Sequence, residues 1–315
     1  MYLSIIIPIY YGSKTISRLV DSINSHIEKE LDGKLYEIIL VNDGSKDDTD
    51  LVCSNLAVTF PKTIKYFDLA KNFSEHNAVI AGLNNCQGMY AAIIDDDFQN
   101  PPSEIIKLLK KIQDSNADVV FAKYSQKKHH WFRNLGSKFN DYVGNIMLNK
   151  PKELYLCSFK IIRQNLIKEI IKYKGPFPYI DGLILRSTHH IETQLVIHDY
   201  RETGKSNYTL TKLISLWSNM FINFSIKPLR WSLVTGFIFS LSGFLLAIKF
   251  IIEKIIYPDI PIGWASAIVS TLIFSGVQLI VLGVVGEYIG RSYLGHTNTP
   301  QYVLRKVIAN GKIIE

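Results

Sequence analysis

The chain has 315 residues, of which 47% are hydrophobic and 20% charged, with a formal net charge of +7 at pH 7 and three cysteines. Three widely separated cysteines fit reduced thiols and exclude a disulfide framework or a zinc site of regular cysteine spacing. No motif of interleaved aromatic and basic residues accompanies the positive charge, so we expect no nucleic-acid partner and assign the charge to an anionic membrane face and phosphate ligands, with a generic basic surface as the alternative.

The first 121 residues alternate expected strands and helices joined by short loops. The expected strands cover residues 3–9, 37–42, 65–69, 89–94 and 119–121, and the expected helices residues 13–30, 47–59, 75–84 and 102–115. This alternation predicts an α/β domain with a mostly parallel sheet and helices on both faces. Neither a Gly-x-Gly-x-x-Gly turn after the first strand nor a Gly-Lys-Ser/Thr loop is present, so phosphates must be held in another way.

The most informative stretch is residues 93–102, Ile-Ile-Asp-Asp-Asp-Phe-Gln-Asn-Pro-Pro. An apolar run that ends in clustered carboxylates predicts a buried strand that delivers acids to its carboxyl end, where open α/β sheets bind ligands. Asp95 and Asp97 are two residues apart and can converge on one Mg²⁺ or Mn²⁺, and such a metal can hold a diphosphate. Taken alone, the segment fits a solvated acidic turn equally well.

Two segments of the middle region have no clear place in the sheet. Residues 123–133 are rich in Lys, His and Gln and predict a mobile basic loop, with simple solvated charge as the alternative. Residues 210–224 are amphipathic and predict a helix in the membrane interface, with a core helix as the alternative. The apolar face of this segment comprises Leu213, Leu216, Trp217, Met220 and Phe224.

The last third contains two long apolar segments. Residues 231–252 are apolar except for Lys249, and residues 264–286 carry no charge. As helices, both are long enough to cross a hydrocarbon core of about 30 Å, and the short connection between them predicts a tight transmembrane hairpin. Two buried helices of a soluble domain are the alternative.

Basic residues flank the hairpin on both sides, at Lys227 and Arg230 before it and at Arg291, Arg305 and Lys306 after it. By the positive-inside rule, both ends of the hairpin are expected in the cytoplasm. No signal peptide is evident at the N-terminus, so the large domain is expected to be cytoplasmic as well.

These features predict four parts along the chain. They are a cytoplasmic catalytic domain (1–208), an amphipathic juxtamembrane segment (209–230), two transmembrane helices (231–286) and a cytoplasmic C-terminal tail (287–315).

A series of motifs runs through almost the whole chain. It comprises Ser4-Ile-Ile-Ile-Pro8-Ile-Tyr10, Val41-Asn-Asp43-Gly-Ser, Lys71-Asn72 with His76, Asp95-Asp-Asp97-Phe-Gln99-Asn-Pro-Pro, Trp131-Phe-Arg133 with Ser137, Arg201 with Gly204-Lys-Ser206-Asn-Tyr, Lys227-Pro-Leu-Arg230 and Gly286-Glu-Tyr-Ile-Gly-Arg291. In this order, and with the C-terminal hairpin, the motifs resemble family 2 glycosyltransferases of the GT-A fold. Within that family they are most similar to the polyprenyl-phosphate glycosyltransferases, which include dolichol-phosphate mannose synthases, bactoprenol glucosyltransferases and undecaprenyl-phosphate 4-deoxy-4-formamido-L-arabinose transferases.

The resemblance implies a donor side and a metal site. The residues expected at the nucleotide are Pro8, Tyr10, Asp43 and Lys71. Asp95, Asp97 and Gln99 are expected to hold Mg²⁺ or Mn²⁺ with the donor diphosphate, and both aspartates are expected to be catalytic.

The resemblance also implies phosphate-binding groups on the acceptor side. Arg133 and Ser137, on or beside the basic loop, would meet the acceptor phosphate. Arg201, with Ser206 near it, would bind phosphate at the mouth of the site. Both arginines are expected to be catalytic, because a planar guanidinium can bind two phosphate oxygens at once.

Several positions depart from the family pattern. The usual Asn-Glu after Tyr10 is Tyr11-Gly12, Asn42 stands where an aspartate is common, and Ser74 replaces a frequent glycine. Leu154 occupies the place of an aspartate that is proposed as a general base in many members, and Glu153 is one residue away from it. A polyprenyl monophosphate has a second pKa of about 6, so the acceptor is largely ionised near pH 7 and needs no side chain to remove a proton.

The resulting hypothesis is an inverting, metal-dependent enzyme that transfers one sugar from a nucleotide sugar to undecaprenyl phosphate at the cytoplasmic face of a bacterial inner membrane. UDP donors are favoured, the product would supply a cell-surface glycan or a lipid A modification, and the resemblance allows a homotetramer. A processive polysaccharide synthase is one alternative, although Lys227 stands at the glutamine of the Gln-x-x-Arg-Trp motif and only two spans are expected. A membrane-anchored scaffold with a decayed transferase domain is the other, motivated by Gly12, Asn42 and Leu154.

Overall fold

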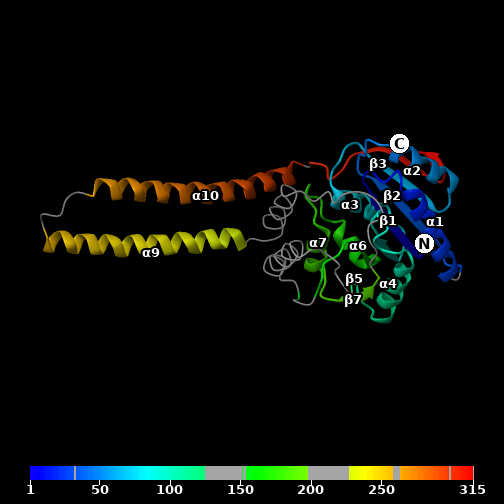
Figure 1. Cartoon of the computed structure of the whole chain (residues 1–315), viewed down its shortest axis with the longest axis horizontal. Coiled ribbons are helices and arrows are strands. Elements are labelled where there is room, and N and C mark those ends of the chain that lie inside the picture. The colour runs from blue at the N-terminus through cyan, green and yellow to red at the C-terminus, as the bar shows by residue number, and fades with distance from the viewer. Residues whose placement is uncertain are drawn as a thin grey trace. The chain divides into compact units, whose positions relative to one another are not determined.

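The computed structural model describes residues 1–197, 227–257, 263–297 and 299–314, without residues 32, 125–150, 152 and 153. The chain divides into two units, one formed by Met1–Leu213 with Asn298–Glu315 and one formed by Ile214–Thr297. The first unit contains the sheet and its helices, and the second contains two long helices (Figure 1). The predicted interface helix at 210–224 lies outside the described residues. Of the basic loop predicted at 123–133, the first two residues belong to a strand that ends at Tyr124, and the others are not described.

The described part of the first unit is built on a nine-stranded sheet with the order β7-β5-β6-β4-β1-β2-β3-β8-β9. The strands are β1 (Leu3–Ile9), β2 (Tyr36–Asn42), β3 (Ile64–Leu69), β4 (Tyr90–Ile93), β5 (Val119–Tyr124), β6 (Lys160–Arg163), β7 (Ile191–Val196), β8 (Leu304–Ala309) and β9 (Lys312–Ile313). Strands β4, β1, β2 and β3 form a parallel centre, whereas β6 and β8 run antiparallel to their neighbours. The predicted mostly parallel sheet is confirmed, and the carboxyl ends of its four central strands meet at one edge.

Helices cover both faces of this sheet (Figure 1). They are α1 (Ile16–Glu30), α2 (Thr49–Thr59), α3 (Glu75–Asn85), α4 (Ser103–Asp114), α6 (Gln164–Ile170) and α7 (Ile180–Ser187). Apolar residues at a spacing of three and four bury one face of α1 against alternate residues of β1, including Ile5 and Ile7. Ile6 points to the opposite face, where α3 packs so closely that a Cβ at Gly82 would lie 2.4 Å from Ile6 Cγ2.

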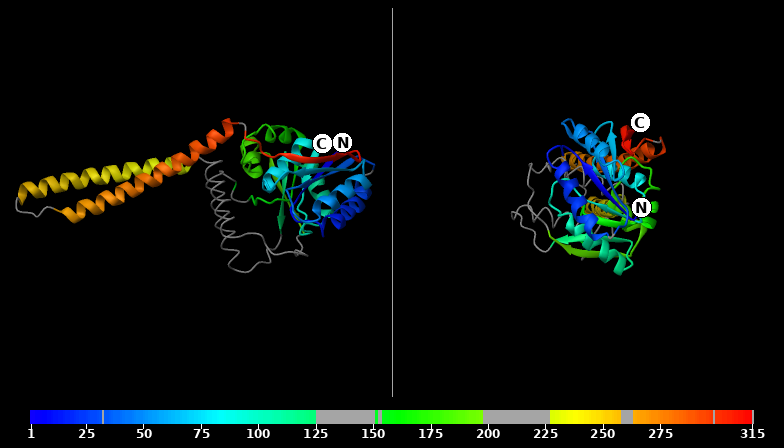
Figure 2. Two further views of the ribbon diagram at one scale, coloured as in Figure 1. Left: turned by 90° about the horizontal axis from the view of Figure 1, so that it is seen from above. Right: turned by 90° about the vertical axis from the view of Figure 1, so that its right-hand side faces the viewer.

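The C-terminal residues return to the sheet, an arrangement that the sequence did not predict. Strand β8 pairs antiparallel with β3, and β9 pairs with β8, so both extend the edge of the sheet (Figure 2). Arg305 Nε donates to Asp68 Oδ2 at 2.5 Å, and Lys306 Nζ lies 2.5 Å from Asp50 Oδ1. The second half of the expected tail is therefore part of the catalytic domain.

The second unit consists of α9 (Lys227–Ile256) and α10 (Trp264–His296). Both are long and apolar enough to cross a membrane, and none of the residues in their most hydrophobic windows is buried within the protein. Phe239 and Phe274 contact each other edge to face across the pair, with ring centroids 6.3 Å apart. The apolar exposure favours the predicted hairpin over two core helices, because core helices would bury these side chains.

Candidate active site

The expected donor-side residues lie at the carboxyl edge of the parallel strands. Pro8 is aligned with Val41 of β2, and β2 in turn pairs with β3 up to Asn42 and Asp68. The amide of Asp43 donates to the carbonyl of Ile9 at 2.9 Å. The ends of β1, β2 and β3 therefore bring Tyr10, Asp43 and Lys71 to one edge of the sheet.

Asp43 is a buried carboxyl at the base of this edge. Its side chain is 3% exposed, and Oδ1 accepts a hydrogen bond of 2.7 Å from the amide of Phe73. Burial raises the pKa of Asp43 from 3.8 to about 6, although the amides of Phe73 and Ser74 oppose the shift. The loop after β3 approaches closely here, because a Cβ at Gly44 would lie 2.4 Å from the carbonyl carbon of Lys71.

An aromatic surface stands next to Asp43. Tyr10 is 39% exposed and packs edge to face against Tyr11, with ring centroids 4.5 Å apart. The amide of Tyr11 is held by Ser45 Oγ at 2.9 Å. A planar base can pack on such rings while a buried carboxyl accepts a hydrogen bond from it, so this corner suits a nucleotide.

The carboxylates expected to bind metal follow β4 at the same edge. The amide of Ile94 donates to the carbonyl of Ile6, which brings Asp95 beside β1. Oδ2 of Asp95 accepts a hydrogen bond of 2.5 Å from Ser158 Oγ. Oδ1 of Asp97 accepts a hydrogen bond of 3.1 Å from the amide of Gln99, and this closes a tight turn.

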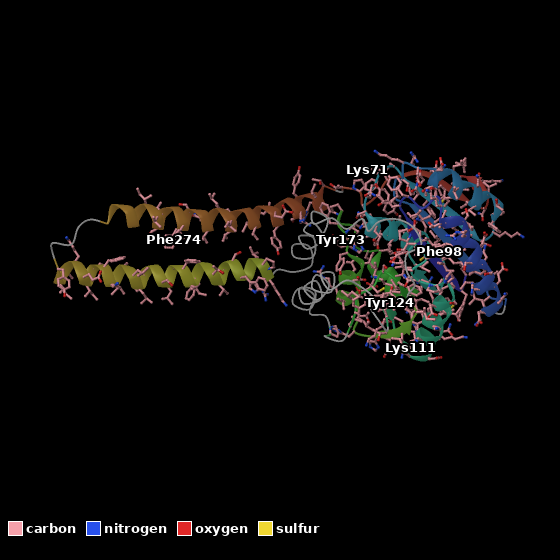
Figure 3. All side chains as sticks on the ribbon, viewed as in Figure 1. Lys71, Phe98, Lys111, Tyr124, Tyr173 and Phe274 are labelled. Carbon is pink, nitrogen blue, oxygen red and sulfur yellow. The ribbon has the colours of Figure 1, made fainter. Side chains whose placement is uncertain are left out.

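The turn is fixed on its outer side by Phe98, which adopts a positive φ of 59°. Phe98 is labelled in Figure 3. The guanidinium of Arg18 lies over its ring, 5.1 Å from the centroid. A left-handed backbone at a bulky residue requires support from its surroundings, and this packing supplies it. The backbone of the turn that carries Asp95 and Asp97 is therefore constrained.

The described residues fit a metal ion that is coordinated partly by the protein and partly by the phosphates of a bound ligand. No group of three His, Cys, Asp or Glu within them is placed to hold a metal ion alone. Two carboxylates on one turn, followed in the chain by Gln99, would leave several coordination positions for phosphate oxygens. Mg²⁺ is commonly bound in this way, through one or two carboxylates and the phosphates of a substrate.

Gly12, one of the departures from the family pattern, has a local structural reason. A Cβ at this position would lie 2.4 Å from Asp96 Oδ2 and 2.6 Å from Ile9 Cγ2. The carboxylate of Asp96 thus occupies the space that a side chain at residue 12 would need.

Sequence reasoning missed a buried ion pair near the turn that carries Asp95 and Asp97. Lys160, the first residue of β6, is 3% exposed and pairs with Asp181 in the first turn of α7. Its ammonium group also lies 5.1 Å from the centroid of the Phe121 ring. Because β6 runs antiparallel to β4, its first residue lies opposite Ile93 at the carboxyl edge. The short sequence of β6 carries no signal that predicts this pairing.

Two residues at the start of α3 experience the charges of this region. The pKa of Glu75 is raised, because the surrounding protein desolvates its carboxyl and Asp95 repels its charge. The pKa of His76 is lowered, chiefly because burial disfavours the charged imidazolium. Glu75 is nevertheless exposed to solvent.

The acceptor-side predictions fall mainly on residues that are not described. Arg133, Ser137, Arg201 and Ser206 lie outside the described residues, as does Glu153. Leu154 is described and is 6% exposed. An apolar side chain buried at this position provides no general base.

Comparison with known proteins decides the family. The model of glycosyl transferase family 2 matches residues 4–171. The chain belongs to glycosyl transferase family 2. This confirms the resemblance seen in the sequence, and the protein is a glycosyltransferase.

Similar proteins match this glycosyltransferase over nearly its whole length. Undecaprenyl-phosphate 4-deoxy-4-formamido-L-arabinose transferase of Proteus mirabilis (strain HI4320) is 31% identical over 314 residues, which cover 97% of this chain and 93% of the relative. The protein of the same name from Serratia proteamaculans (strain 568) is 32% identical with the same coverage. A match of this coverage includes both long apolar helices.

A solved structure shows the same fold. Glucosyl-3-phosphoglycerate synthase from Mycobacterium tuberculosis, in complex with Mn²⁺, UDP and glucosyl-3-phosphoglycerate, aligns with a TM-score of 0.50 at 16% identity. The alignment covers 69% of this chain and 76% of that chain. The predicted GT-A fold is confirmed for the catalytic domain, which is followed in the chain by the two apolar helices.

Proposed function

We propose that this glycosyltransferase moves a single sugar from a nucleotide sugar, with UDP donors favoured, to undecaprenyl phosphate at the cytoplasmic face of a bacterial inner membrane. The observation that carries the proposal is the turn bearing Asp95 and Asp97, at the same sheet edge as Tyr10 and Asp43. The names of the two bacterial relatives support the acceptor, and the two candidate spans support a membrane-bound substrate.

On the donor side, Asp43 and the tyrosine pair would bind the nucleotide. Asp95 and Asp97, with Gln99, would hold Mg²⁺ or Mn²⁺ together with the diphosphate. The mycobacterial synthase of the same fold supports this assignment, because it was solved as a complex with Mn²⁺ and UDP. When bound, the metal would stabilise the negative charge of the departing nucleoside diphosphate.

On the acceptor side, the reaction needs alignment more than it needs a base. The acceptor phosphate is largely dianionic near pH 7, since its second pKa is about 6. Buried Leu154 is compatible with this chemistry, because no proton has to be removed. From the sequence, Arg133 and Arg201 would neutralise and orient this phosphate, with Ser137 and Ser206 beside them. Attack from the face opposite the leaving group would invert the anomeric carbon.

The replacement Asp97→Ala tests the proposal. It removes one of two charged metal ligands and should lower kcat/KM at least about 100-fold. The reason is that a bound metal lowers the activation free energy by several kcal/mol. The measurement is transfer of labelled sugar to undecaprenyl phosphate by full-length protein in detergent. Asp114→Ala, at the exposed end of α4, is the matched control and should retain the wild-type rate.

Three outcomes would contradict the proposal. Equal activity of the Asp97 and Asp114 variants would exclude the metal-binding role of the turn. A wild-type protein that binds UDP-sugars but transfers nothing to a lipid phosphate would favour the scaffold, and products carrying several sugars would favour a processive synthase.

A further inference from the structure

The segment between α6 and α7 packs against the start of α3, near the candidate site. We call residues 173–179 the α6–α7 loop. The loop folds on itself, because Tyr173 Oη donates to the carbonyl of Phe177 at 3.3 Å. Gly175 lies against the same ring, and a Cβ there would approach Tyr173 Oη to 2.4 Å. Its shape thus depends on contacts within the loop as well as on its anchors.

The first anchor of the loop is the start of α3. Asn77 Nδ2 donates a hydrogen bond of 3.5 Å to the carbonyl of Pro176. The His76 ring packs edge to face against Tyr179, with centroids 5.1 Å apart. Two residues beyond Tyr179, Asp181 forms the buried ion pair with Lys160. These contacts attach the loop to the start of α3 and to β6, the strand that pairs with β4 just before Asp95.

The second anchor comes from the other end of the chain. Gln301 is 8% exposed, and its Nε2 atom donates to the carbonyls of Tyr173 and Gly175, both at 3.0 Å. Two carbonyl oxygens can only accept, so an amide nitrogen with two hydrogens satisfies both. The two hydrogen bonds therefore require an amide group on the side chain at position 301, and they fix the orientation of that group.

The neighbours of Gln301 hold it in this place. The carbonyl of Val303 accepts a hydrogen bond of 2.8 Å from the amide of Ala70, at the end of β3. Tyr302 is hydrogen-bonded to Asn84 of α3. Residues 301–303 thus contact the end of β3, α3 and the α6–α7 loop. In the chain they come only a few residues after Thr297, the C-cap of the second candidate span.

We propose that Gln301 is a positioning residue that sets the α6–α7 loop as the sugar-binding wall of the donor site. The inference rests on the proposed function for the identity of the ligand. In the proposed function, the nucleotide contacts Tyr10 and Asp43 at the ends of β1 and β2. The loop instead packs on the start of α3, and the ion pair of Asp181 with Lys160 attaches its end to the strand beside β4, which precedes Asp95. Gln301 therefore acts on recognition of the sugar and leaves recognition of the nucleotide unchanged. Because Gln301 lies in the segment that follows the second candidate span, the position of this wall also depends on that segment.

The replacement Gln301→Leu tests the proposal in the full chain, because it keeps much of the volume and removes both donors. We expect the KM of a UDP-sugar to rise about tenfold, as for the loss of two hydrogen bonds. The Kd of UDP alone should stay within about twofold of wild type, because UDP lacks the sugar. Gln301→Asn keeps the amide and should recover part of the loss. Gln113→Leu, on an exposed face of α4 and bonded to Tyr2, is the matched control and should behave as wild type.

Hydrogen exchange provides a second readout that does not require transfer. In Gln301→Leu, amides of residues 173–179 should exchange faster, while those of β1 and β2 should keep the wild-type rate. Unchanged exchange in the loop would overturn the proposal, and so would an equal loss of affinity for UDP and UDP-sugar. A wild-type protein without transfer activity would contradict the proposed function, and the exchange result would still decide the role of Gln301.

Discussion

Among single residues, Asp43 offers a pH-dependent test of the donor corner. Its pKa is about 6 in the folded protein and 3.8 when unperturbed, so between these values the folded state binds more protons. The free energy of unfolding should therefore fall as the pH rises from 4 to 7, relative to that of Asp43→Asn. A shift of about two pKa units at ~1.4 kcal/mol each limits the change to about 3 kcal/mol. Urea titration followed by circular dichroism measures it, and a difference that stays flat across this range would contradict the assigned burial.

The residues of the donor side could be predicted from the sequence because they follow strands of one parallel sheet. Asp43 and Asp95 each come directly after an apolar run, and carboxyl ends of parallel strands share an edge. Ser158, Lys160 and Asp181 could not be predicted in the same way. Their places depend on the antiparallel strand β6 beside β4, and no periodicity in four residues specifies that neighbour.

At the scale of elements, β8 completes the edge of the sheet and satisfies a buried charge. Asp68 is fully buried and accepts hydrogen bonds from Asn42 Nδ2 at 2.8 Å and from Arg305 Nε at 2.5 Å. Arg305→Leu would leave this carboxylate without its cationic partner and should lower the free energy of unfolding by about 2 kcal/mol. Lys312→Leu, on exposed β9, is the control and should change it by less than about 0.5 kcal/mol. Equal effects of the two replacements in a denaturant titration would show that β8 does not depend on this ion pair.

The strands and helices of the first 121 residues agree with the sequence within three residues at each end, since alternating apolar runs and amphipathic stretches predict them directly. Strands β8 and β9 escaped prediction for a physical reason. Strand β8 pairs with β3, which lies more than 230 residues earlier, as in the pair of Asp68 with Arg305. A short pattern near the C-terminus does not indicate a partner at that distance.

At the scale of the whole molecule, one chain combines a GT-A domain with two candidate membrane spans. The sheet is completed only by residues that follow the second span, so the two long helices are an insertion between strands β7 and β8 of one domain. A lipid-linked acceptor requires an enzyme that works at a membrane surface, and this arrangement tethers the catalytic domain through both chain connections.

The central claim is metal-dependent transfer of one sugar to a polyprenyl phosphate. The most direct measurement incubates purified full-length protein in detergent with undecaprenyl phosphate, Mg²⁺ or Mn²⁺ and a panel of UDP- and GDP-sugars, and detects lipid products by mass spectrometry. The proposed function predicts one donor class that yields undecaprenyl phosphate carrying a single sugar, and loss of that product when the metal is chelated. A folded protein that forms no lipid-linked sugar from any donor, or that forms it equally well without metal, would contradict the claim.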